Sequence, residues 1–537
     1  MLPVLFVPTA VSPSPESNRP PLRVVKGMTT IMTHFIKTIP PFDGGKKEPC
    51  EKRPKVRLSV LTLAVCLLTL TACGENTPSA SLPEQNASSE AFSAESFGET
   101  DRSAVGEPEE SQPADEFPKV EFPEVVDPEI NVPPFTETPE TFPEDLPESE
   151  GLTYVLNADG NSYKVMYVGA CTDSTIRIPA YHEDGKPITV IGDGAFHSAT
   201  AVTGVYLPDT VTLIKRGAFD NCKKLEWIRI PDHATLEEYV FVGCIALKSI
   251  TLPSTMTVLE NDLLRDCRSL TQVILPKGLR TIEHFAFANC ESLKRINLPE
   301  GLQSIGTSAF QRSGLTFIVF PDSVTSIENR VLMGCEALEA VQLPAGLQLL
   351  SDQIFEGCAA LSAVALPETL RSMGHGVFKS CSSLTSIRIP DSVTQVGVGA
   401  FENCTALKAI ELSENLTQLP QFFMDACTSV EKIHIPEKVK TIGSDAFHGC
   451  TSLKVIYAKG VEILESQAFA YCDVLEAVSL GKNLRSMDGV FKSSPNVVIY
   501  YDGTMAEWNA IEAVDLYDGK YSDSARIICT DGNIPIP

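Results

Sequence analysis

The sequence predicts a β-rich solenoid, and two observations carry this prediction: a long internal repeat and the spacing of apolar residues within it. From about residue 190 onward, an apolar residue that is phenylalanine in most copies recurs every 22 or 23 residues. A single copy of this length cannot cover its own apolar edge, whereas stacked copies form one continuous core. The fourteen marker residues are Phe196, Phe219, Phe241, Leu264, Phe287, Phe310, Leu332, Phe355, Phe378, Phe401, Met424, Phe447, Phe469 and Phe491.

The spacing inside one repeat predicts a short parallel strand. Residues 381–390 read CSSLTSIRIP, and we expect Leu384, Ile387 and Ile389 to point inward. The last two alternate with outward residues as a strand requires. Pro390 then ends the strand, since proline cannot donate to a parallel ladder. A polar turn, a second short apolar stretch and a Gly-rich turn lead to the next marker.

The residue that precedes the repeat cysteine is predicted to adopt a left-handed backbone conformation. It is usually asparagine, glycine or aspartate, the residue types that tolerate a positive φ. The examples that carry the prediction are Asn221, Gly243, Asp266, Asn289, Gly334 and Asn403.

Residues 1–72 are interpreted as an N-terminal extension and a lipoprotein signal peptide. A basic cluster at 52–57 precedes an apolar run, Leu58 to Leu70, which is too short for a comfortable membrane span but suits a signal-peptide core. Leu70-Thr71-Ala72-Cys73 resembles the bacterial lipobox, which implies cleavage before Cys73 and lipidation of its sulfur. Residues 1–45 fit no export pattern, which favours a translation start near Met32 or later.

Residues 73–150 are predicted to be the lipid-attachment cysteine followed by a disordered acidic stalk. Residues 74–150 carry 21 acidic and 2 basic side chains among many prolines and serines. Such a composition buries too little apolar surface to offset the entropy of ordering, and like charges extend the chain. The alternative interpretation is a short binding motif within the stalk, such as EFPKVEFPEV at residues 116–125.

The charge distribution disfavours nucleic acid as a partner. The chain has a formal net charge of −26, and the stalk accounts for most of it. About −13 remains for the region from residue 151 onward. Neither part offers the basic stripe that neutralises phosphates.

The repeated motif resembles the BspA-like branch of the leucine-rich-repeat proteins, which occur on bacterial surfaces. On this resemblance, residues 193–498 form the array of repeats. Residues 151–192 look like the N-terminal unit of such proteins, and residues 499–537 look like their C-terminal closing unit. The resemblance implies a leucine-rich-repeat solenoid capped at both ends, with adhesion as the function of some members.

No pattern of catalysis or metal binding emerges from the sequence. Eleven of the 16 cysteines occupy one repeat position, where neighbouring side chains run parallel and do not converge as a disulfide requires. We therefore expect small, buried, free thiols and no zinc site. The eight histidines form no metal-ligand pattern, and no nucleophile motif or phosphate-binding loop is present. The sequence predicts neither an enzyme nor a cofactor.

The candidate binding residues are the outward side chains of the repeat strands, five and seven positions after each cysteine. Aromatic residues and arginine are the types that anchor interfaces. They concentrate in the N-terminal half of the array, whereas the repeats from Ala340 to Ala409 carry mainly small side chains there. The alternative is that these positions are ordinary strand residues without a ligand. The candidates are Trp227, Arg229, Ile274, Arg295, Phe317 and Val319.

The sequence therefore favours an exported, lipid-anchored bacterial surface protein that binds a protein or glycan partner of a host or neighbouring cell. One alternative is a passive structural component of the envelope. Another is a lipoprotein that captures a sugar or peptide and delivers it to a partner, although a solenoid lacks the deep closing cleft that such capture needs.

Overall fold

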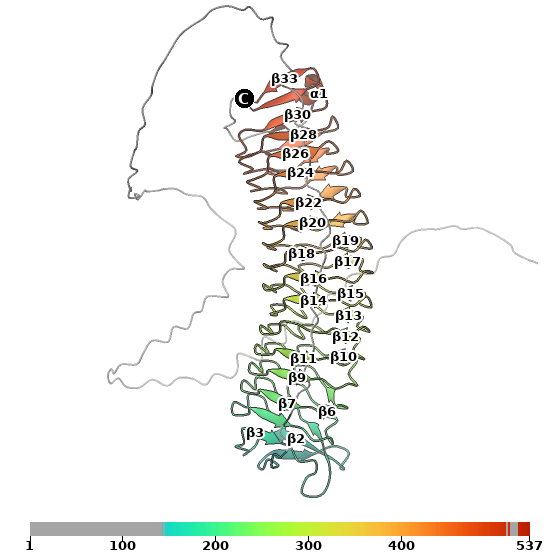
Figure 1. Cartoon of the computed structure of the whole chain (residues 1–537), viewed down its shortest axis with the longest axis vertical. Helices are drawn as coiled ribbons and strands as arrows, with labels where there is room; N and C mark the ends of the chain where they lie inside the picture. The colour runs from blue at the N-terminus through green and yellow to red at the C-terminus, as the bar shows by residue number, and fades with distance from the viewer. Residues whose placement is uncertain (1–141, 143–144, 512–513, 516–524, 537) are drawn as a thin grey trace, which may run out of the picture. The chain divides into compact units, whose positions relative to one another are not determined.

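The computed structural model describes residue 142 and residues 145–511, 514–515 and 525–536. The signal-peptide segment, Cys73 and most of the predicted stalk lie outside these residues. Most of the described residues form successive turns of one coil, and nearly every turn supplies one strand to each of two columns (Figure 1). The prediction of a β-rich solenoid with parallel strands and a repeat of 22–23 residues is confirmed.

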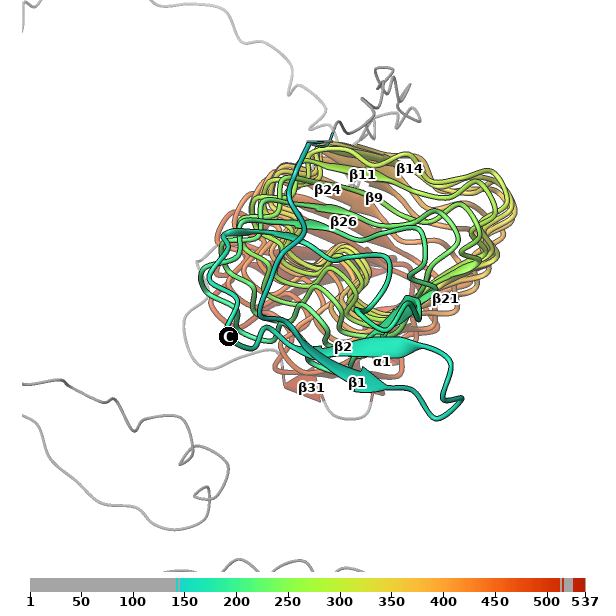
Figure 2. The ribbon, with the colours of Figure 1, turned by 90° about the horizontal axis from the view of Figure 1, so that it is seen from below.

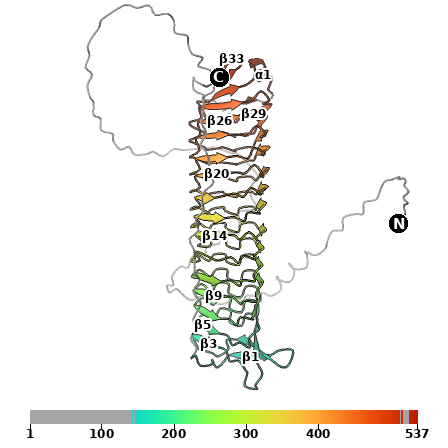
Figure 3. The ribbon, with the colours of Figure 1, turned by 45° about the vertical axis from the view of Figure 1, so that its right-hand side comes forward.

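The first strand column contains the strands predicted from the repeat motif. Neighbouring strands within it run parallel wherever they pair, and the column shows well in the rotated view of Figure 3. Its members are β3 (Thr175–Arg177), β5 (Gly204–Tyr206), β7 (Trp227–Arg229), β9 (Ser249–Thr251), β11 (Gln272–Ile274), β14 (Phe317–Val319), β16 (Ala340–Gln342), β18 (Ala363–Val364), β20 (Ser386–Arg388), β22 (Ala409–Glu411), β24 (Lys432–His434), β26 (Val455–Ala458), β28 (Ala477–Leu480), β30 (Val498–Tyr501) and β32 (Arg526–Cys529).

The second strand column forms where the sequence indicated only a second short apolar stretch. Figure 2, viewed from below, places it on a different side of the coil from the first column. Its members are β4 (Ile188–Ile191), β6 (Leu213–Ile214), β8 (Thr235–Leu236), β10 (Val258–Leu259), β12 (Thr281–Ile282), β13 (Ser304–Ile305), β15 (Ser326–Ile327), β17 (Leu349–Leu350), β19 (Ser372–Met373), β21 (Gln395–Val396), β23 (Gln418–Leu419), β25 (Thr441–Ile442), β27 (Ile463–Leu464), β29 (Ser486–Asp488) and β31 (Val514–Asp515).

A hairpin closes each end of the coil. At the N-terminal end, β1 (Thr153–Leu156) pairs antiparallel with β2 (Tyr163–Tyr167), which continues the second column through β4. At the C-terminal end, β32 pairs antiparallel with β33 (Gly532–Pro535). The short helix α1 (Met505–Asn509) begins with a capping box between Thr504 and Glu507. The parallel stacking of the array thus ends in an antiparallel pair of strands at each end.

The core of the coil is a ladder of the marker residues. All fourteen are buried, and the phenylalanines of successive turns stack with ring centroids 5.0–5.7 Å apart in most steps. The ladder changes where Met424 replaces phenylalanine. There Phe423, one residue earlier, is the buried ring, and it meets Phe401 edge to face at 5.5 Å.

The eleven repeat cysteines form a second buried ladder beside the rings. Each thiol donates to a backbone carbonyl of the preceding turn, as Cys381 does to Phe355 O at 3.2 Å. Burial raises the pKa of the Cys222 thiol to about 12 and that of Cys335 to about 11. These thiols therefore stay protonated near neutral pH and can act as donors.

Among the described residues, no helix has the length and apolar character needed to cross a membrane.

Candidate binding surface

The outward side chains of the first strand column, together with Arg295 and Asn297 at the equivalent positions of the turn that lacks a strand, form the surface that we call the strand face. Along β7, Trp227 and Arg229 are half-buried, and Ile228 between them is buried in the core. Because alternate side chains of a strand point to opposite sides, the flanking two residues must point outward. The same pattern holds for β11 and β14. All six predicted binding residues lie on this face, half-buried.

Trp227 is held between two parts of the chain. Its indole lies so close over Gly204 that a Cβ there would come within 2.3 Å of the ring. Glycine at this position therefore lets the tryptophan lie flat on the neighbouring turn. The ring of Phe142 contacts the indole, with centroids 5.7 Å apart. Part of the predicted stalk thus touches the first of the candidate anchors.

Tyr206, on the turn before Trp227, is flanked by two arginines. The guanidinium of Arg177 lies 5.0 Å from the centre of its ring, and that of Arg229 lies 5.2 Å away. Arg229 also donates to Leu207 O at 2.8 Å and pairs with Asp209 at 2.6 Å. These contacts fix the predicted residue Arg229 in place and form one aromatic and cationic cluster with two residues that the sequence reasoning did not single out.

Arg295 and Phe317 form a second cluster further along the strand face. The guanidinium of Arg295 lies 5.7 Å from the centre of the Phe317 ring, on the adjacent turn. Residues 295–297 form no strand, although the neighbouring Ile296 is buried as the repeat requires. The structure thus brings Arg295 and Phe317 together, while Trp227 lies apart from them, on the strand of Arg229, and packs on Gly204 and Phe142. The six predicted residues are spread over five successive turns.

A third aromatic cluster lies near the C-terminal end of the strand face. His434 stacks on Tyr457 with ring centroids 5.0 Å apart, because β24 and β26 pair in register at these two residues. Lys459 lies 5.6 Å from the centre of the Tyr457 ring. Both aromatic residues stand seven positions after a repeat cysteine, so the same columns that identified Trp227 contained the signal for this cluster.

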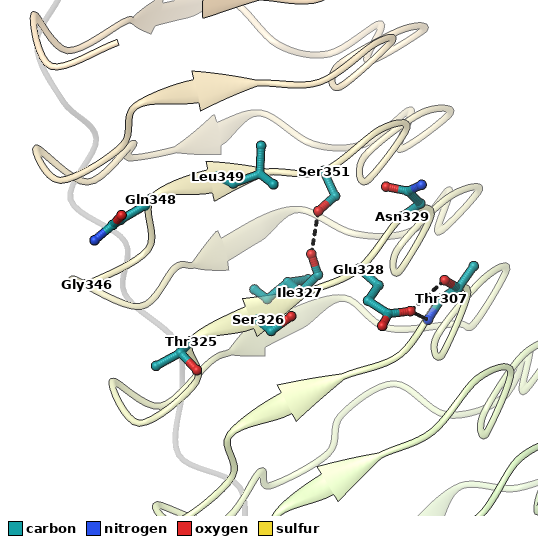
Figure 4. A pocket seen from close by; sticks show the side chains of 10 residues that line it. All are labelled: Thr307, Thr325, Ser326, Ile327, Glu328, Asn329, Gly346, Gln348, Leu349 and Ser351. Atoms are coloured by element: carbon teal, nitrogen blue, oxygen red, sulfur yellow. Dashed lines mark hydrogen bonds between the residues drawn. The ribbon is translucent and has the colours of Figure 1, made fainter. Parts of the chain in front are cut away.

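A shallow cavity of about 470 Å³ lies on the second strand column, at β15 and β17 (Figure 4). Its lining offers small hydroxyl groups, amides and the half-exposed Leu349. The carboxylate of Glu328 already accepts hydrogen bonds from Thr307 N at 2.9 Å and from its hydroxyl at 2.7 Å. Ser351 donates to Ile327 O of the neighbouring turn. The polar groups that are paired here stabilise the stacking of turns.

Among the residues that the structure describes, no group of three or more His, Cys, Asp or Glu side chains is placed to hold a metal ion.

The sequence comparison identifies one family. A model of the BspA type leucine-rich repeat region matches residues 189–316, 303–421 and 371–498, which together cover more than half of the chain. A comparison with curated proteins finds no match.

Solved structures give further likenesses. A leucine-rich cell surface protein of Faecalibacterium prausnitzii is 25% identical, with 69% of this chain and 98% of that chain covered and a TM-score of 0.39. A leucine-rich repeat protein of Bacteroides ovatus is 22% identical, with 71% and 99% covered and a TM-score of 0.38. The pneumococcal vaccine antigen PcpA is 17% identical, with 72% and 98% covered and a TM-score of 0.45. On the family match, the chain belongs to the BspA type leucine-rich-repeat proteins.

Proposed function

We propose that this protein is a bacterial surface lipoprotein whose strand face binds a protein or glycan partner, and that its role is recognition rather than catalysis. The observation that carries the proposal is the concentration of half-buried Trp227, Tyr206 and Phe317 beside arginines on one regular surface. Aromatic and arginine side chains supply a large contact area together with directed hydrogen bonds, and they dominate the energetics of interfaces. Membership of a leucine-rich-repeat family supports a binding role.

The proposed location rests on the leader sequence. The basic cluster at 52–57, the apolar run and Cys73 together suit export followed by lipid attachment. Two or three acyl chains hold a protein at a membrane far more firmly than one, at about 0.8 kcal/mol for each buried CH₂.

The test is a screen of the purified protein against arrays of glycans and host matrix proteins, followed by variants of the strand face. Phe317→Ala is expected to weaken binding of any hit by about thirtyfold, which corresponds to about 2 kcal/mol. Trp227→Ala is expected to weaken it similarly. Ser386→Ala is the matched control, because Ser386 is a half-buried outward residue of the same face whose side chain is small and uncharged.

A thermal melt of each variant separates lost contact from lost folding. Trp227 needs this control most, since it also packs on Gly204 and Phe142. Normal binding by both Phe317→Ala and Trp227→Ala would show that the partner docks elsewhere.

A further inference from the structure

The last residues of the predicted stalk cross the beginning of the strand face. The backbone N–H of Ser149 donates to Arg177 O at 2.9 Å, and the Arg177 side chain donates to Leu146 O at 2.9 Å. Phe142 contacts Trp227, two strands further along the column. Followed backward from Ser149 to Phe142, the chain therefore moves from β3 to β7 toward the later repeats.

The strand face is basic, although the folded region as a whole is acidic. From residue 175 to residue 528, its outward positions carry six arginine or lysine side chains, His434, and a single carboxylate, Glu411. Two of the arginines also pair with acids of neighbouring turns: Arg229 with Asp209, and Arg388 with both Glu368 and Glu411. The six are Arg177, Arg229, Arg295, Arg388, Lys432 and Arg526.

The sequence immediately upstream of Phe142 has the opposite charge. Residues 107–141 contain eleven acidic side chains and one lysine. They also contain the pairs Phe117-Pro118 and Phe122-Pro123, which repeat the Phe142-Pro143 pair at the point of contact with Trp227.

We propose that residues 107–141 lie along the strand face of the same chain, with their carboxylates opposite its basic side chains. Charge complementarity supports this segment as the occupant, and the contact of Phe142 with Trp227 favours the segment of the same chain over that of a second molecule. Because the segment is joined to Phe142, its local concentration at the strand face of its own chain is on the order of millimolar. The segment of a second copy must reach the face by diffusion.

The length of the segment fits the length of the face. From β7 to β24, where Lys432 lies, there are nine strand steps, or roughly 43 Å at about 4.8 Å per step. An extended, proline-rich chain at about 3.1 Å per residue covers this distance in roughly 14 residues. Counted back from Phe142, this brings Asp127 and Glu129 near Lys432.

Self-docking goes beyond the proposed function, because it can be measured with no partner present. It predicts that any partner of the strand face must displace the acidic segment or bind beside it.

The test is zero-length coupling of the full chain with a water-soluble carbodiimide. The reagent activates a carboxylate, and a lysine amine in contact attacks it to form an amide while a urea leaves. Peptide mass spectrometry is expected to find Lys432 joined to a carboxylate of residues 107–141, chiefly Asp127 or Glu129. The yield is expected to fall severalfold in about 0.5 M NaCl, where screening shortens the reach of charges.

Three controls test whether the linkage is specific to Lys432 and to the acidic segment. Lys432→Arg keeps the charge but removes the reactive amine, so the linkage must disappear while the fold remains. Lys215 lies beside Asp193 after β6 of the second strand column, and we expect no comparable linkage from it to residues 107–141. Replacing the eleven acidic residues of the segment with Asn and Gln is expected to abolish the linkage.

A sample that mixes two isotope labels distinguishes self-docking from docking between molecules. Coupling a mixture of unlabelled and ¹⁵N-labelled protein is expected to give only products of uniform label. Mixed-label products would overturn the proposal in favour of contact between copies. The absence of any linkage from Lys432, or equal linkage from Lys215, would also overturn it and would leave the screen for a partner unaffected.

Discussion

The cysteine that recurs in eleven turns acts as a hydrogen-bond donor as well as a small buried side chain. Its thiol reaches the carbonyl of the preceding marker residue, for example from Cys472 to Phe447 O at 3.2 Å. In two turns serine stands in its place. Ser494 makes the equivalent bond to Phe469 O at 2.9 Å, and Ser313 lies 3.3 Å from the sulfur of Cys335. Both substitutes are small and can donate.

The sequence predicts the burial of this position but not its donor function. A cysteine repeated at one position indicates a small buried side chain, because its neighbours along the coil cannot converge into disulfides. Which atom the thiol contacts depends on how far successive turns are offset, and the spacing of residues does not contain that information. The serines at 313 and 494 could have indicated the donor function from sequence alone. Serine and cysteine are similar in size and both can donate a hydrogen bond, but they differ in hydrophobicity.

We expect Cys381→Ala to lower the free energy of unfolding by about 1–2 kcal/mol, because it removes the thiol bond to Phe355 O and leaves a small cavity. Cys381→Ser keeps a donor and is expected to cost less than half as much. Urea titrations that compare midpoints at an unchanged slope measure both effects. Equal losses for the two variants would show that the donor contributes nothing.

Each turn contains two backbone positions with positive φ. The predicted left-handed conformation of the residue before the cysteine is confirmed at all six residues on which the prediction rested, with φ between 59° and 71°. The second position lies four residues earlier and was not predicted, since its occupants include Tyr239, Phe285 and Phe422. These bulky residues disfavour the left-handed region on their own. The stacking of the turns imposes it, for instance through the bond from Phe285 N to Thr307 O at 3.0 Å.

Ala426 and Gly357 provide a matched pair at the first of these positions. Ala426 has φ 58°, and Gly357 has φ 74° with room for a Cβ, whose nearest neighbour would lie at an ordinary contact distance of 3.6 Å. Their backbone N–H groups make equivalent bonds to the next turn, to His448 O and Lys379 O, each 2.8 Å long. The two residues thus differ mainly in the presence of a Cβ.

We expect Ala426→Gly to raise the free energy of unfolding by about 1 kcal/mol and Gly357→Ala to lower it by a similar amount, because a side chain in the left-handed region costs about 1–2 kcal/mol. The greater entropy of glycine in the unfolded chain offsets part of the difference. Denaturant midpoints measure both changes. Shifts of the same sign for the two substitutions would contradict the backbone explanation.

At the scale of the whole molecule, the array is predictable from sequence because every turn repeats one set of contacts. The marker residues, the inward triplet and the proline after the strand are all local patterns that stacking reinforces. The contacts between Phe142 and Trp227 and between Leu146 and Arg177 occur once. They join a segment of stalk-like composition to the repeats, and composition alone places that segment outside the fold. The boundary at residue 151 stays a prediction.

The attachment of the whole molecule depends, on our proposal, on one cysteine outside the described residues. Cys73→Ser is expected to abolish incorporation of labelled palmitate in a bacterial host and to move the protein out of the membrane fraction, because the sulfur that carries diacylglycerol is gone. Cys66→Ser is the matched control, since Cys66 lies seven residues earlier in the same apolar leader and should leave labelling unchanged. If Cys73→Ser still takes up palmitate, the lipobox interpretation is wrong. If Cys66→Ser alone loses labelling, the modified residue lies earlier in the leader, and cleavage before Cys73 must be abandoned.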